Sequence, residues 1–390
     1  MNELTTALQA VLDRAVAAGE IAGANLLILR RGEELLYVQS GLADREAGRP
    51  YTRDTIARLY SMTKPVTAAA AMILVQRGLL DLEQPLGELF PSFRGSMVWE
   101  NGKKVPAHRQ IVVGDLLNMT SGLPYPGTDE AGQEVAGVFE ELDSRLYGDD
   151  PMSTQELVDR LGACGLAFHP GDKWMYGTSA DVLGAVIGKV SGQRFGAFLE
   201  ENLFSPLGMA DTGFHVPAEK QHRLAQVYQQ GSPDMTLYET NNLGICYTQH
   251  RAPAFESGGA GLVSTVDDYA KFAAMLIRGG DGILSPGAVE YMTKSRLLPW
   301  QQESLWRSWE GMAGYGYGSL MRILEEPGMA KILGWQGEYG WDGWLGSYFA
   351  NLPAEGLTIL SMQNTTDTGT CAAMRKVRNL LLAADSLGRL

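Results

Sequence analysis

The sequence predicts a mixed α/β (α+β) fold in which antiparallel strands are flanked by helices. Two stretches predict the strands: β-rich runs surround the tight turn at Arg31-Gly32, and another pair surrounds a turn at Pro353–Gly356. Between them lie apolar segments with the period of helices. With 390 residues, 45% of them hydrophobic, the chain has ample material for a core, and its length suits two or three domains or one large domain with an insertion.

The helices are predicted from their apolar period and their end signals. The opening stretch, MNELTTALQAVLDRAVAAGE, is amphipathic, and Gly78 ends a helix that begins near Ser61. Pro65 fits this helix only in the first turn, where its missing N–H matters little. Further helices are predicted within VVGDLLNMTSGLPYPG, over 179–190, from a capping-box-like Ser264/Asp267 start to Gly279-Gly280, and over 371–384.

Composition argues against several classes of partner. The formal net charge of −13 is the opposite of the clustered Lys and Arg that nucleic acid or an anionic membrane requires. The N-terminal stretch lacks the features of a signal peptide, and Cys164, Cys246 and Cys371 are widely spaced, as reduced thiols are. We therefore expect a cytoplasmic protein without a membrane partner. The five histidines form no metal-binding motif, so we expect no metal and no cofactor.

Ser61 and Lys64 stand three residues apart at the predicted start of a buried, Ala-rich helix. Backbone N–H groups at a helix start have no intrahelical partner and can hold a developing oxyanion. Lys64 lies nearly one turn on, so its amine can reach the serine oxygen, and a desolvated lysine loses its proton readily. The alternative is a capping serine with a solvated lysine, but the head of a buried helix is an unusual place for a solvated lysine.

Two aromatic residues in predicted loops extend this site. Tyr176 precedes the helix over 179–190, and a phenol beside a cationic lysine can act as a base, although a core aromatic is the usual alternative. The stretch 123–151 is acidic and rich in Gly, and we interpret it as a mobile lid or wall over a cleft. Tyr125 lies in this stretch as a candidate substrate-binding residue.

Four stretches resemble, in the same chain order, class C β-lactamases, penicillin-binding D-Ala-D-Ala peptidases and, most closely, family VIII carboxylesterases. They are GLADREAGRPYTRDTIARLYSMTK, LLNMTSGLPY, WMYGTSADVLGAVIGKVSG and GGAGLVSTVDDYAKFAAML, and the likeness spans about residues 26–364. The resemblance implies a β-lactamase/transpeptidase-like fold with the cleft between two domains. We expect residues 1–60 and 225–390 to form the mixed domain with the antiparallel sheet, and residues 61–224 the mainly helical domain.

The resemblance implies three catalytic residues. Ser61 matches the acylated nucleophile and Lys64 its partner, in the Ser-x-x-Lys motif. Tyr176 matches the tyrosine of the Tyr-x-Asn block. Thr178 stands where that block has its asparagine, so this substrate-binding position departs from the lactamase pattern.

A third block completes the implied site. Trp341, Asp342 and Gly343 stand where the lactamases have Lys-Thr-Gly, and Trp344 inherits the second oxyanion N–H, beside that of Ser61. The lysine of Lys-Thr-Gly helps to hold a substrate carboxylate, so tryptophan in its place disfavours anionic substrates. Family VIII esterases are similar in replacing this block with a Trp-x-Gly type. An apolar acyl or alcohol group suits the nearby aromatic residues, which are Trp335, Tyr339, Trp341, Trp344 and Tyr348.

Together these residues predict a serine hydrolase that cleaves small-molecule carboxylic esters through an acyl-enzyme on Ser61, with Lys64 and Tyr176 as coupled acid and base. The sequence lacks the Gly-x-Ser-x-Gly elbow of α/β-hydrolases. Alternatives are a β-lactamase, a D-Ala-D-Ala-type peptidase, another amide hydrolase or an acyltransferase of the same fold. A further alternative is a binding protein that is acylated once without turnover. The natural substrate, the acyl-chain preference and the oligomeric state stay open.

Overall fold

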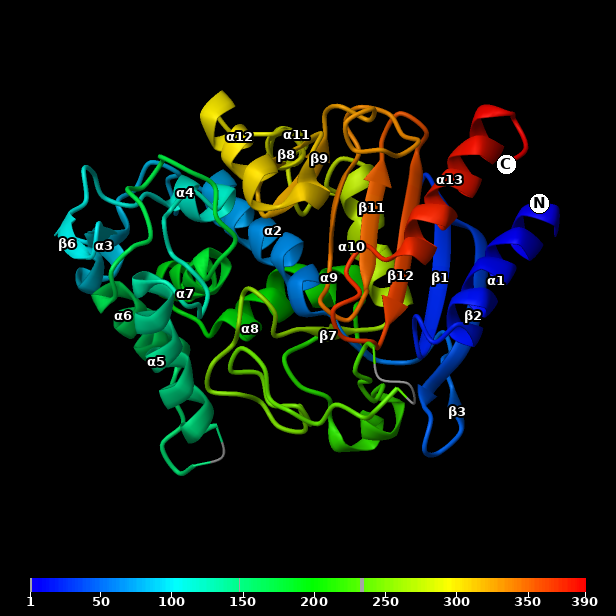
Figure 1. The fold of residues 1–390 in the computed structure, drawn as a ribbon, viewed down its shortest axis with the longest axis horizontal. Coiled ribbons are helices and arrows are strands. Elements are labelled where there is room, and N and C mark those ends of the chain that lie inside the picture. The colour runs from blue at the N-terminus through cyan, green and yellow to red at the C-terminus, as the bar shows by residue number, and fades with distance from the viewer. Residues whose placement is uncertain (1, 147, 232–234) are drawn as a thin grey trace.

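A computed structural model describes residues 2–146, 148–231 and 235–390. Its main feature is an eight-stranded sheet with the strand order β3-β2-β1-β12-β11-β10-β9-β8, in which neighbouring strands run antiparallel (Figure 1). The strands are β1 (Gly23–Arg30), β2 (Glu33–Asp44), β3 (Arg49–Pro50), β8 (Tyr315–Gly318), β9 (Met321–Leu324), β10 (Tyr339–Asp342), β11 (Tyr348–Leu352) and β12 (Leu357–Gln363). The predicted hairpin turns at Arg31 and Gly32, whose φ angles of 53° and 85° fit the tight turns that join twisted strands.

Helices cover both faces of this sheet. Helices α1 (Asn2–Ala17) and α13 (Ala372–Ser386) pack on one face, and α10 (Val266–Ile277) packs on the other (Figure 1). Strand alternation explains the division: Leu26 and Ile28 join the core under α1 and α13, whereas Leu27 and Leu29 join the core under α10. The predicted fold class, an antiparallel sheet flanked by helices, is confirmed.

The middle of the chain is mainly helical and lies beside the sheet. Helix α7 packs against α2, α4, α6 and α8. The helices of this part are α2 (Thr63–Gln76), α3 (Leu86–Leu89), α4 (Val113–Asn118), α5 (Glu130–Arg145), α6 (Thr154–Ala163), α7 (Ser179–Ser191), α8 (Phe195–Leu199) and α9 (Ser205–Leu207). Two short sheets accompany them, β4 (Ala57–Arg58) with β7 (Val263–Ser264), and β5 (Met97–Glu100) with β6 (Lys103–Pro106).

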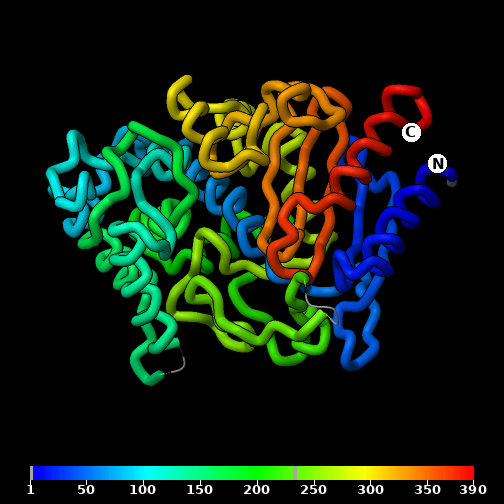
Figure 2. Tube along the Cα trace, viewed as in Figure 1, coloured from blue at the N-terminus to red at the C-terminus, as the bar shows by residue number. Residues whose placement is uncertain are grey.

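The remaining segments connect these two parts. Figure 2 shows the described part of the chain between α9 and β7 running along the lower side of the molecule, mostly in loops, with one short 3-10 helix at Ala218–Arg223. Helices α11 (Pro286–Met292) and α12 (Pro299–Ser308) lead from α10 to β8. One apolar core includes Leu27 of β1, Val66 of α2, Leu183 of α7 and Trp341 of β10. Because this core is continuous across both parts, the division at residues 60 and 225 stays a prediction.

Two local predictions are refined by the structure. Helix α10 begins one residue later than expected, because the hydroxyl of Thr265 accepts the N–H of Asp268 at 3.2 Å while Ser264 contacts Thr212. The stretch 123–151 contains one helix, α5, and its role as a lid stays a prediction.

Candidate active site

The turn that presents Ser61 is held in an unusual backbone conformation. Strand β4 is followed by the single helical turn Tyr60–Met62 and then by α2. Tyr60 has a φ of +43°, a left-handed conformation that a bulky residue rarely adopts. Such strain persists only where the surrounding structure enforces it. Here the Leu59 N–H donates to Leu262 and the Tyr269 hydroxyl donates to the carbonyl of Met62, so the turn is fixed on both sides of Ser61.

Lys64 is completely buried in the first turn of α2. Its Nζ lies 3.2 Å from Ser61 Oγ, 3.2 Å from the Tyr125 hydroxyl and 2.8 Å from the carbonyl oxygen of Gly259. Burial lowers the pKa of the Lys64 amine to about 7, and the carboxylates of Asp181 and Asp342 partly oppose this. The amine is therefore close to half-protonated at neutral pH and can accept a proton from Ser61.

Tyr176 approaches Ser61 from the loop before α7. Its hydroxyl donates to Ser61 Oγ at 2.7 Å and accepts the indole N–H of Trp341 at 3.2 Å. Lys64 Nζ lies 4.5 Å from the centre of the Tyr176 ring. Burial raises the pKa of the Tyr176 phenol well above its usual range, although its hydrogen bonds with Ser61 and Trp341 act in the opposite direction. The phenol is therefore protonated at neutral pH and is suited to pass a proton on.

The two predicted substrate-binding residues outside the third block, Tyr125 and Thr178, differ in their positions. Tyr125 packs edge-on against Tyr176, with ring centroids 5.7 Å apart, and bonds to Lys64. Its hydroxyl thus belongs to the Ser61–Lys64 group. Thr178 is fully buried at the start of α7, and its hydroxyl has no hydrogen-bond partner among the described residues. The structure does not bring Thr178 into contact with Ser61 or Lys64.

The third block ends strand β10 beside the nucleophile turn. A Cβ on Gly343 would lie 2.4 Å from the carbonyl oxygen of Leu59, so only glycine permits this close approach. The ring of Trp344 packs edge-on against Tyr60 at 5.0 Å, and its indole N–H donates to Asp367 at 2.6 Å. In the part of the chain that the structure describes, the backbone N–H of Trp344 donates to no other group. It is thus free to bond an oxyanion formed at Ser61.

The side chains of Trp341 and Asp342 are both held by contacts within the protein. Trp341 is 1% exposed and is held by its bond to Tyr176. Asp342 pairs with Arg322 at 3.2 Å and also accepts the hydroxyl of Thr370. The Arg322 guanidinium is itself buried, 5.7 Å from the Trp341 ring centre. The negative charge of Asp342 is therefore neutralised by its own partners.

The aromatic wall of the site differs from the predicted one. Trp335 is 55% exposed, Tyr339 bonds to Asn351, and Tyr348 bonds to Arg378 in the core under α13. Tyr339 and Tyr348 are therefore absent from the wall, and no ring contact joins Trp335 to Tyr176 or Trp341 among the described residues. The rings that surround Tyr176 and Trp341 instead come from separate elements, and they are Tyr125, Trp174, Trp309 and Tyr317. Of these, only Trp309, at 38%, is counted among the exposed large apolar side chains of the described chain.

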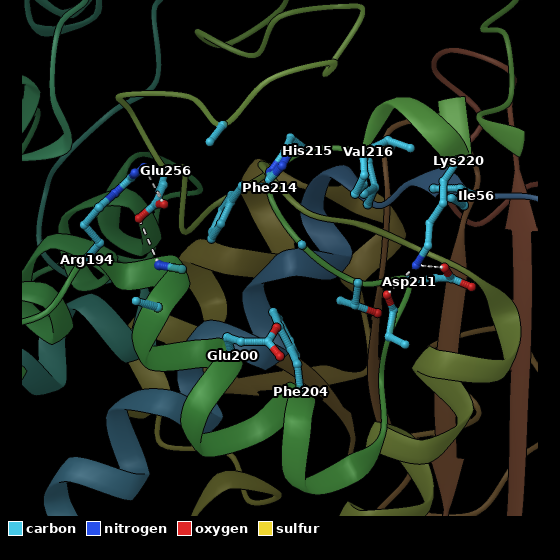
Figure 3. Close-up of a pocket in the computed structure, with 18 residues that line it drawn as sticks. Ile56, Arg194, Glu200, Phe204, Asp211, Phe214, His215, Val216, Lys220 and Glu256 are labelled. Carbon is cyan, nitrogen blue, oxygen red and sulfur yellow. Dashed lines mark hydrogen bonds and ion pairs between the residues drawn. The ribbon is translucent and has the colours of Figure 1, made fainter. Parts of the chain in front are cut away.

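A separate cavity of about 370 Å³ lies between α8 and the loop that follows α9 (Figure 3). Four of its charged side chains pair with one another, Arg194 with Glu256 at 2.8 Å and Lys220 with Asp211 at 2.7 Å, and Glu200 accepts the hydroxyl of Ser205 at 2.5 Å. None of the predicted catalytic residues lines it. Ser61, Lys64 and Tyr176 therefore lie outside this cavity.

The described residues lack two further features. No group of three or more His, Cys, Asp or Glu side chains there is arranged to hold a metal ion. Within the same residues, no helix combines the length and the apolar character needed to cross a membrane.

Comparison with known proteins identifies the family. The sequence profile described as Beta-lactamase matches residues 8–384. The chain belongs to the beta-lactamase family. It is 34% identical to "Esterase EstB" of Burkholderia gladioli over 94% of this chain and 92% of that protein. It is 26% identical to "Lovastatin esterase" of Penicillium rubens over 74% of each. The resemblance inferred from the four stretches is thus confirmed.

A solved structure agrees with this family assignment. "EstCE1, a hydrolase with promiscuous acyltransferase activity" superposes with a TM-score of 0.82 at 25% identity, and the match covers 98% of this chain and 99% of that chain. The expected β-lactamase-like fold is therefore shown by comparison as well as by topology.

Proposed function

We propose that this protein is a serine hydrolase that cleaves neutral carboxylic esters of small molecules through an acyl-enzyme on Ser61. One observation carries the proposal: Ser61 Oγ lies within hydrogen-bond distance of both Tyr176, at 2.7 Å, and the buried amine of Lys64, at 3.2 Å. A nucleophile bonded to a depressed-pKa base is the arrangement that covalent acyl transfer requires. The esterase names of two relatives support carboxylic esters as the substrate class.

The geometry supports the following order of events. Neutral Lys64 takes the hydroxyl proton of Ser61 as Oγ attacks the ester carbonyl. The N–H groups of Ser61 and Trp344 hold the oxyanion. When the carbon–oxygen bond of the ester breaks, the Lys64–Tyr176 pair returns the proton to the leaving alcohol. Water then attacks the acyl-enzyme, gives a proton to the same pair, and the acid leaves as Ser61 regains its hydrogen.

One label and one kinetic measurement test this proposal. A p-nitrophenyl phosphonate ester should form one adduct, located on Ser61 by mass spectrometry, and Ser61→Ala should show neither the adduct nor turnover of p-nitrophenyl butyrate. Circular dichroism of Ser61→Ala should match the wild type. An adduct on another serine rejects the proposal. A burst of one equivalent without steady-state turnover supports the acylated binding protein.

Acyl transfer to an alcohol is a second candidate that one observation favours. EstCE1 is described as a hydrolase with promiscuous acyltransferase activity. The deacylation step accepts any hydroxyl compound that reaches the acyl-enzyme and gives its proton to the Lys64–Tyr176 pair. Adding an alcohol to the p-nitrophenyl butyrate assay should then yield the butyrate ester of that alcohol. Butyric acid as the sole product would reject this candidate.

A further inference from the structure

The turn from Ser257 to Ala260 lies against Lys64 and has no part in the steps above. Residues 258–260 of this turn begin the glycine-rich stretch GGAGLVSTVDDYAKFAAML. The carbonyl of Gly259 accepts from Lys64 Nζ at 2.8 Å, which is shorter than the 3.2 Å from that nitrogen to Ser61 or to Tyr125. The position of this carbonyl therefore decides where the amine lies relative to Ser61.

Two helices fix this turn. From α7, the buried carboxylate of Asp181 accepts the Ser257 hydroxyl at 2.5 Å and the Gly259 N–H at 3.0 Å. The Ser257 hydroxyl in turn accepts the N–H of Ala260 at 2.9 Å. From α2, the Thr67 hydroxyl donates to the carbonyl of Gly258 at 2.7 Å. The carboxylate of Asp181 thus accepts hydrogen bonds from two residues of the turn, Ser257 and Gly259.

The packing of Gly259 leaves this arrangement little freedom. A Cβ on Gly259 would lie 2.9 Å from one Asp181 oxygen and 3.1 Å from the Tyr125 hydroxyl. The glycine is therefore wedged between the carboxylate and a phenol that also contacts Lys64. A shift of Asp181 would move the Gly259 carbonyl and, with it, the amine.

We propose that Asp181 is a positioning residue for the acid–base group: through Gly259 it holds the Lys64 amine beside Ser61, and its carboxylate favours the ammonium form of that amine. The proposal rests on the proposed function, because it assumes that Lys64 is the proton acceptor. Asp181 acts on the reaction only through Lys64.

The charges around Lys64 support this role. The titratable groups that face its amine are the carboxylates of Asp181 and Asp342 and the phenols of Tyr125 and Tyr176. Asp342 is already paired with Arg322. Asp181 forms no ion pair with an arginine among the described residues. Burial raises the pKa of its carboxyl, whereas the hydrogen bond from Ser257, the charge of Lys64 and the N–H of Gly259 favour the ionised form. Its charge therefore acts mainly on Lys64.

Asp181→Asn removes the negative charge of the side chain but keeps its shape. The asparagine oxygen can still accept from Ser257 and Gly259, but the negative charge is lost. Because that charge favours the ammonium form, its loss should lower the pKa of Lys64. The acid limb of kcat/KM for p-nitrophenyl butyrate should then shift to lower pH by about one unit, with KM changed less than twofold.

Asp268→Asn is the matched control. Asp268 is also a buried carboxylate that accepts the backbone N–H of Asp211 and the hydroxyl of Thr212, and unlike Asp181 it also pairs with Lys271 at 2.8 Å. It makes no contact with Lys64, so its variant should keep the wild-type midpoint. An unchanged midpoint in Asp181→Asn, or an equal shift in both variants, would overturn the proposal.

Two further measurements make each result decisive. Phosphonate labelling of the wild type at Ser61 tests the proposed function itself, so a labelled enzyme with an unmoved midpoint rejects only the role of Asp181. If circular dichroism shows that Asp181→Asn does not fold, Ser257→Ala tests the same turn with the charge in place. Loss of the Ser257 bond should lower kcat about fivefold at unchanged KM, and a wild-type kcat would reject the proposal.

Discussion

The indole N–H of Trp341 donates to the phenol oxygen of Tyr176 at 3.2 Å, and that phenol donates to Ser61 Oγ at 2.7 Å. In the proposed mechanism, a tryptophan thus orients the proton carrier at the position that the resemblance matches to the lysine of Lys-Thr-Gly. An indole donates one hydrogen bond but brings no charge. The phenol is therefore held in place without the cation that would favour its ionised form, which agrees with a protonated Tyr176 and with Lys64 as the proton acceptor.

Trp341→Phe should lower kcat for p-nitrophenyl butyrate about tenfold, because a hydrogen bond of this kind contributes about 0.5–1.5 kcal/mol. KM should change little, since Trp341 is buried and does not reach solvent. Tyr317→Phe is the control: its ring lies 5.2 Å from that of Trp341, and its hydroxyl has no partner among the described residues. Equal kinetics in the two variants would show that the indole N–H has no role in turnover.

The pH dependence of the reaction should report the protonation of Lys64. Burial lowers the pKa of this amine to about 7, so the ammonium dominates below pH 7 and the neutral amine above it. If the neutral amine takes the Ser61 proton, kcat/KM for a neutral ester should rise with pH and reach half its maximum near pH 7. A half-maximum above pH 9, as for a solvent-exposed lysine, or activity that falls as pH rises through 7, would contradict this assignment.

The grouping of Ser61, Lys64 and Tyr176 could be predicted from the sequence because each carries a side chain with distinctive chemistry within a local pattern, and their catalytic roles stay a proposal. Gly259 could not, because the group that contacts Lys64 is a backbone carbonyl, which any residue possesses. Asp181 lies in the first turn of α7, where an acidic residue is expected merely to favour the helix dipole. Its contact with the Ser257 turn arises only from tertiary packing.

The aromatic wall shows a second limit of sequence reasoning. Residues near one another along a strand were expected to share the site, but strand side chains alternate between the two faces of a sheet. Tyr348 consequently lies in the core under α13. Trp309 reaches Tyr176 from the end of α12, with ring centroids 5.6 Å apart. No pattern within either segment indicates that contact. The predicted sheet and helices, in contrast, depend on local periodicity and turn residues.

Substrate charge should affect turnover because the third block offers no cation to a carboxylate. Asp342 is neutralised by Arg322, so an anionic substrate meets neither a partner nor strong repulsion. Loss of one charge-assisted hydrogen bond corresponds to about 1.5–3 kcal/mol, or about one to two decades in kcat/KM. We expect p-nitrophenyl butyrate to be hydrolysed that much faster than the hemisuccinate p-nitrophenyl ester, and far faster than a chromogenic cephalosporin. Preference for the cephalosporin would favour the lactamase alternative.

Gly343 should be essential for oxyanion stabilisation although its side chain is absent. A Cβ at this position would lie 2.4 Å from the carbonyl oxygen of Leu59, so Gly343→Ala must push the end of β10 away from the turn that carries Ser61. The backbone N–H of Trp344 would then leave the position facing the oxyanion. Removal of one such donor typically costs about 10²–10³ in kcat, and KM should change much less because the donor acts on the transition state.

Gly328→Ala is the matched control for Gly343→Ala, because no atom lies within 4 Å of a Cβ built there. It should retain the wild-type kcat and melting temperature. Gly343→Ala should retain the Lys64-dependent pH midpoint near 7, since the acid–base group is not displaced. A fall in kcat together with a shifted midpoint would mean that the substitution disturbs Lys64, and a wild-type kcat would remove the Trp344 N–H from the mechanism.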